Sequence, residues 1–241
     1  MKKHAVSFVL IVGFIAVITG CNSTTGLSGD IIGISKLTNT NAVQIPNSTG
    51  ITVSIEGTNF STTTDSSGQW DSSGLTTGSY NIDLSKSDYG TQKIIDFQFA
   101  GGGQANAGDV ALWQIPTFYV TGLSDSISSG NINFRGAFSG VYPVDRKDAY
   151  TFFGASASVS SDPKNYLFWV DGVGPSGDST FSSSIDTATL LENGFNSGET
   201  VYMISYGGNL GAISYTDPVT GRQVFSGLNS TPSNVVSFKM P

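Results

Sequence analysis

The chain has 241 residues and carries 11 basic against 18 acidic side chains, which gives a formal net charge of −7. An acidic chain with scattered lysines lacks the basic stripe that nucleic acid requires, so nucleic acid is excluded as a partner. Charged residues make up only 12% of the chain, but 38% hydrophobic and 11% aromatic residues supply enough apolar surface for a folded core.

Residues 1–20 have the pattern of a cleaved secretory signal. Lys2 and Lys3 precede the apolar stretch AVSFVLIVGFIAVI (5–18), which is short for a membrane span because a span needs about 20 residues. The sequence Ile18-Thr19-Gly20-Cys21 resembles the lipobox of bacterial lipoproteins. The resemblance implies cleavage before Cys21, a diacylglycerol on its sulfur and an acyl group such as palmitate on its new amino group. Several acyl chains on one residue anchor a protein stably in a membrane, whereas one chain does not.

The residue after the cysteine predicts which membrane holds the anchor. In the sorting rule of enteric lipoproteins an aspartate at this position retains the protein at the inner membrane, and this chain has Asn22 instead. We therefore expect a lipid anchor in the outer membrane of the cell envelope, with the periplasmic and surface faces both open.

Cleavage of the signal also removes a side chain on which many catalytic and metal sites depend. His4 is the only histidine and Cys21 the only cysteine, so the mature chain has no histidine, and lipid occupies its single thiol. Ser-His-Asp and Cys-His catalysis are excluded, and so are zinc sites that need histidine or cysteine ligands. We expect no enzyme activity, no cofactor and no metal.

After a polar tether at 21–28, the chain reads as an all-β protein with two β-sandwich domains in tandem. Short alternating or β-branched runs are separated by turns rich in Gly, Ser, Asn and Asp, as is typical of sandwiches. The best helical segment, TATLLENG (187–194), is long enough only for a connecting turn between strands. Pro116 interrupts the pattern, and we place the domains at 29–114 and 117–241. The predicted strands lie in GDIIGIS (29–35), GITVSIEG (50–57), SYNIDLS (79–85), KIIDFQFA (93–100), VALWQIPT (110–117), NINFRGAFSG (131–140), YLFWVDG (166–172), TVYMISYG (200–207) and NVVSFKM (234–240).

In the first of these domains, 29–114, three motifs follow the first strand: GITVSIEGT (50–58), TTTDSSGQW (62–70) and LTTGSYNIDLSKSDYG (75–90). In this order they resemble the carboxypeptidase regulatory-like domain, a transthyretin-like sandwich. The resemblance implies a module that accompanies other functions without catalysing anything. Asp71 departs from the family, which prefers an apolar residue after the aromatic one, and this predicts a frayed strand or a strand end at an edge.

Asp65 in TTTDSSGQW (62–70) is expected to form the corner of a hairpin. Its side chain can accept backbone N–H groups, and Gly68 supplies the permissive dihedral angles. A calcium loop is the alternative, but Ser66, Ser67 and Gln69 stand where oxygen ligands would be dense.

In the second domain, the stretch LLENGFNSGETVYMISYG (190–207) leads from a leucine through a Gly-containing turn into a strand with an early tyrosine. This stretch loosely resembles a fibronectin type III or Ig-like sandwich. The resemblance gives Tyr202 the role of the tyrosine corner.

Aromatic residues in this domain are the candidates for ligand binding. The strand YLFWVDG (166–172) carries bulky groups on both faces, and Phe152-Phe153 raises the same question. One face belongs to the core, and the other must be covered by loops or by a ligand. If a ligand covers it, Trp169, Tyr166 and Phe153 are the aromatics that would stack on sugar rings.

Three functions remain compatible with these residues. The first is a non-catalytic binding or scaffolding module with a protein partner in the envelope, and the second is a carbohydrate-binding lipoprotein that uses exposed aromatics. The third is a carboxylate-based glycoside hydrolase, for which Glu56, Glu192, Glu199 and the aspartates are candidates. Most aspartates adjoin Gly, Ser or Pro, as turn residues do, which places the hydrolase last. AGGGQ (100–104) has no lysine or following helix, and reads as a loop rather than a phosphate site.

Overall fold

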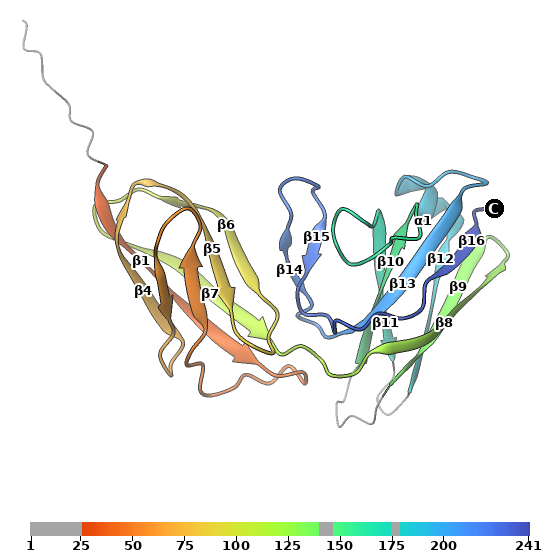
Figure 1. Ribbon diagram of the computed structural model, residues 1–241, viewed down its shortest axis with the longest axis horizontal. Helices are drawn as coiled ribbons and strands as arrows, with labels where there is room; N and C mark the ends of the chain where they lie inside the picture. Colours follow the sequence, from red (N-terminus) through yellow and green to blue (C-terminus); the bar gives the residue numbers. More distant parts are fainter. Residues whose placement is uncertain (1–25, 140–146, 175–178) are drawn as a thin grey trace, which may run out of the picture.

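The computed structural model describes residues 26–139, 147–174 and 179–241, and Figure 1 shows them as two lobes built almost entirely of strands. The expected all-β sandwich fold is confirmed. The signal peptide and Cys21 lie outside the described residues. Within the described ranges no helix has the length and apolar character that crossing a membrane requires.

The N-terminal half contains two sheets that face each other. The first has the strand order β4-β1-β7, with β7 parallel to β1, and the second has the order β3-β2-β5-β6. The strands are β1 (Ser28–Thr38), β2 (Thr52–Ile55), β3 (Ser61–Thr63), β4 (Gln69–Thr76), β5 (Gly78–Ser85), β6 (Gln92–Phe99) and β7 (Gln104–Trp113).

Alternation along β1 decides which of its side chains enter the core. Ile31, Gly33 and Ser35 are buried, while Ile32 and Ile34 point the other way and stay partly exposed. The buried side chains join a hydrophobic cluster that both sheets of this half share. Ile32 and Ile34 are thereby left on the outer face of the sheet.

The sequence predicted that Asp71 would either fray its strand or put the strand end at an edge, and β4 is not frayed at Asp71. The strand runs on to Thr76 and lies at the edge of its sheet, with the exposed Asp71 side chain on the outer face. The other expectation, an edge position, is therefore the correct one. A carboxylate is tolerated here because alternate residues of an edge strand face water.

The C-terminal half contains two further sheets and a hairpin. The sheets have the orders β12-β9-β8 and β11-β10-β13-β16, and the hairpin pairs β14 with β15. The strands are β8 (Val120–Ser128), β9 (Asn131–Phe138), β10 (Lys147–Gly154), β11 (Phe168–Gly174), β12 (Thr180–Asp186), β13 (Thr200–Gly208), β14 (Ile213–Thr216), β15 (Gln223–Phe225) and β16 (Val236–Lys239).

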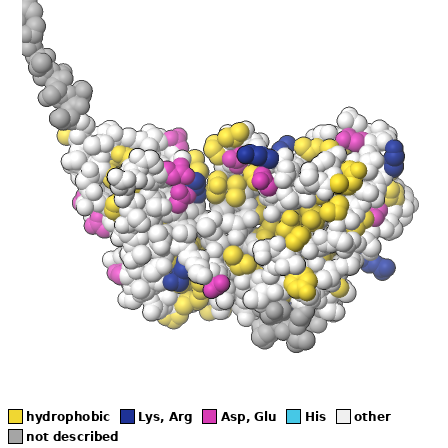
Figure 2. All heavy atoms as spheres, in the orientation of Figure 1, with side chains coloured by type: hydrophobic (Ala, Val, Ile, Leu, Met, Phe, Trp, Pro, Cys, Tyr) yellow, Lys and Arg dark blue, Asp and Glu magenta, His cyan; other side chains and the backbone are white. Residues whose placement is uncertain are grey.

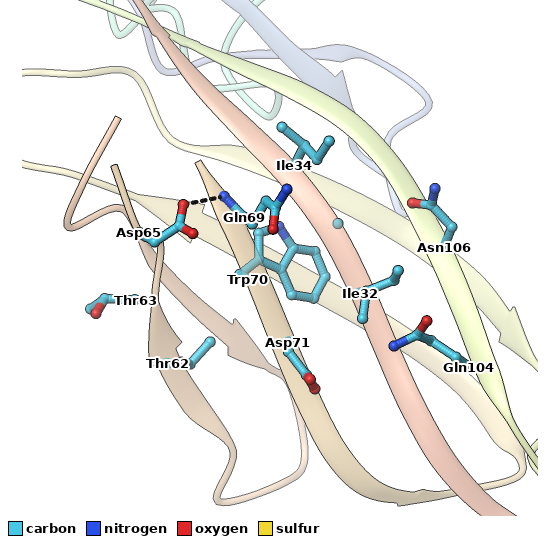
Figure 3. Close-up of a pocket in the computed structure, with 11 residues that line it drawn as sticks. Ile32, Ile34, Thr62, Thr63, Asp65, Gln69, Trp70, Asp71, Gln104 and Asn106 are labelled. Carbon is cyan, nitrogen blue, oxygen red and sulfur yellow. Dashed lines mark hydrogen bonds between the residues drawn. The ribbon is translucent and has the colours of Figure 1, made fainter. Parts of the chain in front are cut away.

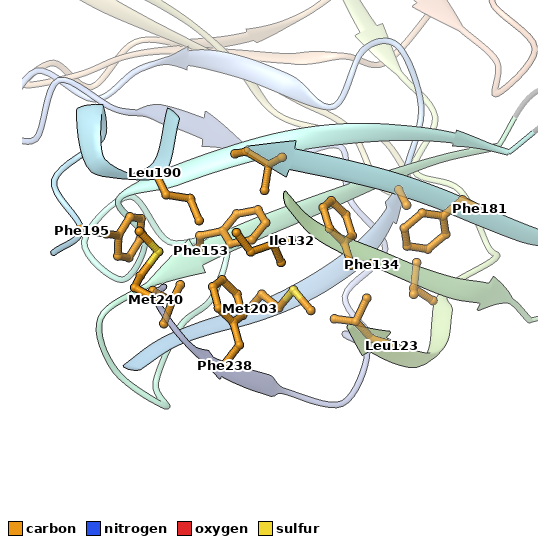
Figure 4. Close-up of a cluster of buried hydrophobic side chains, with 14 of the residues drawn as sticks. Leu123, Ile132, Phe134, Phe153, Phe181, Leu190, Phe195, Met203, Phe238 and Met240 are labelled. Carbon is orange, nitrogen blue, oxygen red and sulfur yellow. The ribbon is translucent and has the colours of Figure 1, made fainter. Parts of the chain in front are cut away.

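Strand β10 is buried on both faces along its whole length. Ala149 and Phe153 enter the core between the two sheets, which Figure 4 shows around Phe134, Met203 and Phe238. The opposite face of β10 carries Tyr150 and Phe152 into a second cluster under the hairpin β14-β15. A strand that is buried on both faces reads as a continuous apolar run, which explains the sequence AYTFF.

The short helix α1 (Thr187–Glu192) forms where the sequence predicted a connecting turn. Asp186 caps it, because its carboxylate accepts the backbone N–H of Thr189 at 2.7 Å. Gly194 follows with a φ of 94°, a conformation that glycine adopts without strain.

The hydrophobic clusters fall on either side of residues 114–117: one lies within 31–112 and the other two within 118–240. This separation supports the division into domains 29–114 and 117–241 that we propose. Figure 2 shows scattered charged side chains on a surface that is largely uncharged.

Candidate functional site

An open pocket of about 540 Å³ lies on the outer face of the sheet β4-β1-β7. Ile32 and Ile34, which alternation points outward from β1, form its apolar floor. Figure 3 shows the polar side chains on both sides of this floor. Drug-sized ligands occupy pockets of about 300–1,000 Å³, so the volume suits a small molecule or a short segment of a polymer.

Three amide side chains stand in the polar walls. Gln104 and Asn106 stand on β7, and Gln69 stands on β4 together with the carboxylate of Asp71. The parallel register pairs Ile32 of β1 with Asn106, so the β7 amides adjoin the isoleucine floor. Each amide offers a donor and an acceptor in one plane.

The hydroxyls of Thr62 and Thr63 continue this wall from β3. The described lining holds no lysine or arginine, so its polar groups are neutral apart from two aspartates. Such a surface can bind neutral polar groups by hydrogen bonds, but it would repel an anion.

Trp70 borders the pocket and is only 4% exposed. Its indole occupies the place where a Cβ on Gly33 would stand, and its Nε1 donates to the buried Ser35 hydroxyl at 3.1 Å. Gly33 is therefore required for the tryptophan to lie against β1. The indole fixes the relative position of β1 and β4, and hence of the floor and one wall.

The turn at Asp65 forms the rim of the pocket and has the corner geometry that the sequence predicted. Its carboxylate accepts the Ser67 hydroxyl at 2.7 Å and the Gln69 backbone N–H at 2.9 Å, and Gly68 has a φ of 80°. The hydrogen bonds from Ser67 and then from Gln69 hold the pKa of Asp65 below its usual value. Among the described residues no group of three or more His, Cys, Asp or Glu side chains gathers as a metal site would require.

The structure places the three predicted ligand-binding aromatics away from this pocket. Phe153 is fully buried between the sheets of the C-terminal half, and Tyr166 is 2% exposed and donates to the Gln223 carbonyl at 2.7 Å. Burial raises the pKa of Tyr166 to about 12. Neither ring is available for stacking on a sugar, which corrects the expectation for these two residues.

Trp169 is half-buried and packs against Tyr150 and Phe225, with ring centroids 5.9 and 5.0 Å apart. The second apolar face of its sheet is therefore covered by the chain itself. The covering segments are the hairpin β14-β15 and the loop that contains Val159 and Tyr166. The sequence left two ways to cover this face, loops or a ligand. Within the described residues, loops and the hairpin cover it.

Among the described residues Glu56 and Asp83 come together, but not as the raised-pKa acid and its partner that glycoside hydrolysis needs. Lys93 bridges Glu56 and Asp83, and its Nζ lies 3.1 Å from the Asp83 carboxylate. The hydrogen bond from Lys93, followed by that from Asn81, lowers the pKa of Glu56, whereas a general acid needs a raised one. Glu192 is exposed at the end of α1, and Glu199 accepts the backbone N–H of Asn196.

Tyr202 lies on β13 and packs against the aromatic cluster beneath the hairpin. Its hydroxyl makes no hydrogen bond within the described residues, so the tyrosine corner is not formed there. The expectation is wrong for a simple reason. Tyr202 points to the face of the sheet that the hairpin covers, whereas a corner tyrosine turns back to the chain a few residues upstream.

Sequence reasoning missed the pocket residues on β7. Gln104 and Asn106 alternate with Ala105 and Ala107, which is the pattern of a half-buried strand. The polar alternation could have marked an exposed face. This face adjoins Ile32 because the first strand of this half, β1, pairs with its last strand, β7. No local sequence signal predicts that pairing.

Neither a protein-family model nor a curated protein matches the sequence. Among solved structures, a candidate carbohydrate-binding protein from Bacteroides uniformis is similar at 15% identity, over 89% of this chain and 100% of that one, with a TM-score of 0.36. A DUF3823 family protein from Parabacteroides merdae is similar at 13% identity, over 89% and 100% of the chains, with a TM-score of 0.32. Another DUF3823 family protein, from Bacteroides ovatus, has 14% identity over 88% and 100% of the chains and a TM-score of 0.33. All three likenesses are distant.

Proposed function

We propose that this chain is a non-catalytic binding module, held at the bacterial cell envelope by lipid on Cys21, and that its pocket on the sheet β4-β1-β7 binds a neutral glycan. The observation that carries the proposal is the composition of the pocket. Amides of Gln69, Gln104 and Asn106 flank an apolar floor of Ile32 and Ile34.

A sugar ring presents hydroxyls at its rim and C–H groups on its face. Planar amides can donate to one hydroxyl and accept from the next, and the isoleucine floor suits the C–H face. The open shape lets a chain of sugars enter and leave, because the pocket lies on a sheet face and not in an enclosed cavity. The pocket thus takes the ligand role that the sequence had given to the aromatics of the other half.

A protein partner is the alternative occupant. An extended peptide would also use the amides, but protein interfaces draw most of their affinity from buried aromatic and arginine anchors. The described lining exposes no such anchor, since its single aromatic residue is the 4% exposed Trp70. The glycan is therefore the better fit.

The binding test uses the full chain in a detergent without a sugar headgroup, titrated with a panel of neutral polysaccharides by calorimetry. We expect at least one glycan to bind, and the Gln104→Ala/Asn106→Ala double variant to weaken that binding tenfold or more. Gln44→Ala is the matched control, because Gln44 is exposed, lies outside the pocket and makes no side-chain hydrogen bond among the described residues.

Two outcomes would count against a glycan in this pocket. One is no binding to any glycan of the panel, which would favour the protein partner and lead to crosslinking in whole envelopes. The other is equal losses in the double variant and in Gln44→Ala, since the pocket would then have no special part in binding. Trp70 fluorescence gives an independent readout, because this indole borders the pocket.

The anchoring part of the proposal rests on the lipobox-like Ile18-Thr19-Gly20-Cys21 and on Asn22. We expect radiolabelled palmitate to be incorporated into the wild-type chain and not into Cys21→Ala. Asn22→Asp should move the protein from the outer-membrane to the inner-membrane fraction. Incorporation of label into Cys21→Ala would rule out this anchor, and an unchanged fractionation of Asn22→Asp would rule out the sorting argument.

A further inference from the structure

The sheet β12-β9-β8 of the C-terminal half has an outer face of small polar side chains around one cation. Along β9 the residues Ile132, Phe134, Gly136 and Phe138 are buried, so Asn133, Arg135 and Ala137 point outward. The neighbouring strands pair Ser124 and Ser182 with Arg135. The guanidinium is thus flanked by a serine on each side.

Arg135 has no partner among the described residues. Other cations do have partners: Lys36, Lys86 and Arg222 each donate to a backbone carbonyl, and Lys93 forms ion pairs. Arg135 is exposed and makes no hydrogen bond, ion pair or ring contact in the parts of the chain that the structure describes. Asp125 lies nearby and forms no ion pair with it. The five N–H donors of the guanidinium therefore face solvent.

Two open hollows meet at Arg135. One, of about 480 Å³, is lined by Gly122 and Gly136, with the apolar side chains of Ala137 and Val173 beside them. The other, of about 540 Å³, is lined by serines of β8 and β12 and by Asn133 and Asp125. Arg135 lines both, so a ligand group at the guanidinium has room for further groups on either side.

We propose that this face binds an acidic glycan, with the carboxylate of a uronic acid residue on Arg135. The planar guanidinium fork matches a carboxylate in a bidentate arrangement. Ala137 and the 44% exposed Val173 offer an apolar surface for the C–H face of the sugar, and the serine hydroxyls and Asn133 can bind the hydroxyls of adjoining residues.

The charge pattern separates this site from the pocket on the sheet β4-β1-β7. Arg135 is the only cation in the described lining of either hollow, whereas the lining of the other pocket has two aspartates and no cation. An acidic ligand is therefore directed to the C-terminal half and a neutral one to the N-terminal half. The inference does not rest on the neutral-glycan proposal, because the two sites share no residue.

The test measures binding of galacturonate, mannuronate and guluronate tetrasaccharides to the full chain at low salt, each beside its methyl ester as the neutral counterpart. We expect at least one free acid to bind at least tenfold more tightly than its ester. Arg135→Gln should remove that difference. Arg135→Lys should fall between the two, since an ammonium keeps the charge but loses the fork.

A further variant sharpens the test. Lys239→Gln, which loses the same unit of charge on another sheet, should change the affinity less than twofold. Thermal unfolding of Arg135→Gln checks that its exposed substitution leaves the fold intact.

The proposal is overturned if none of the three acids binds, if acids and esters bind equally, or if Arg135→Gln retains the wild-type preference. It is also overturned if Lys239→Gln loses as much affinity as Arg135→Gln, because binding would then follow the overall field of the protein. Neutral-glycan binding in the Gln104/Asn106 pocket should be unchanged in Arg135→Gln, so failure at one site can be told from failure at the other.

Discussion

Asp65 shows at the residue scale how one side chain fixes the rim of the pocket. Its carboxylate accepts the Ser67 hydroxyl and the Gln69 backbone N–H, and Gln69 begins β4 next to Trp70. The sequence predicted this corner because Asp and Gly are typical turn residues at this spacing. It did not predict that the corner borders a pocket, since the opposite wall comes from β7.

Stability should depend on pH through this residue. Because hydrogen bonds lower the pKa of Asp65 in the folded chain, its carboxylate stabilises the fold above the unfolded pKa of about 3.9, and this contribution is lost as the pH falls through the lower folded value. We expect Asp65→Ala to lower the free energy of unfolding at pH 7, and the difference from wild type to shrink below about pH 4. Urea unfolding across this range measures it, with the exposed Ser66→Ala as control. A pKa of Asp65 at or above 3.8 in an NMR titration would contradict the argument.

At the element scale, β10 shows how much the alternation of side chains along a strand can predict. Phe152 and Phe153 point to opposite faces of this strand, and both are fully buried. From the sequence it follows that two apolar faces exist and that each needs a cover. Which segment covers the second face does not follow, because the hairpin β14-β15 comes much later in the chain and its short strands, ISYT and QVF, carry no signal of the face they pack against. For this reason the sequence suggested a ligand on this face, and the ligand-binding role is wrong for Tyr166 and Phe153, which are buried.

Phe225 at the end of β15 is the ring that closes this cover. Its centroid lies 4.8 Å from that of Phe152 and 5.0 Å from that of Trp169. We expect Phe225→Ala to lower the free energy of unfolding by about 3–5 kcal/mol, because the truncation leaves a cavity among four aromatic rings. Denaturant titration measures this loss, and the emission of Trp169 should shift to longer wavelength as water reaches it. Val219→Ala at the 85% exposed hairpin tip serves as control, with an expected change within about 0.5 kcal/mol. A loss no larger than in this control would mean that the hairpin does not act as a core element.

At the scale of the whole molecule, the two halves meet through specific contacts and not only through the connecting segment. The Asn209 side chain donates to the Gln114 carbonyl at 2.6 Å, and the Ser226 hydroxyl donates to the Thr91 carbonyl at 2.5 Å. Lys93 of the N-terminal half lies 5.5 Å from the centre of the Tyr215 ring on the hairpin. Pro116 in the sequence indicated a break near this point. The contacts across it could not be predicted, because each joins segments that are far apart in the chain and carry no common pattern.

A further approach across the junction, between Gly211 and the ring of Trp113, gives the sharpest test of a fixed arrangement. A Cβ on Gly211 would stand 1.9 Å from Cγ of Trp113, and the indole has no flexible end that could move aside. Gly211→Ala should therefore push the halves apart while it leaves their separate cores unchanged, because a buried overlap of this size is relieved by moving the packed elements. We expect the wild type to unfold in one calorimetric transition and Gly211→Ala in two. In the variant, the emission of Trp113 should shift to longer wavelength and small-angle scattering should show a larger radius of gyration. Gly103→Ala is the matched control, since a Cβ there meets no atom within 4 Å.

An unchanged radius of gyration together with one transition would show that the loop at Gly211 absorbs the methyl group. The overlap at Trp113 would then be relieved locally, and the expectation that it separates the halves would be wrong.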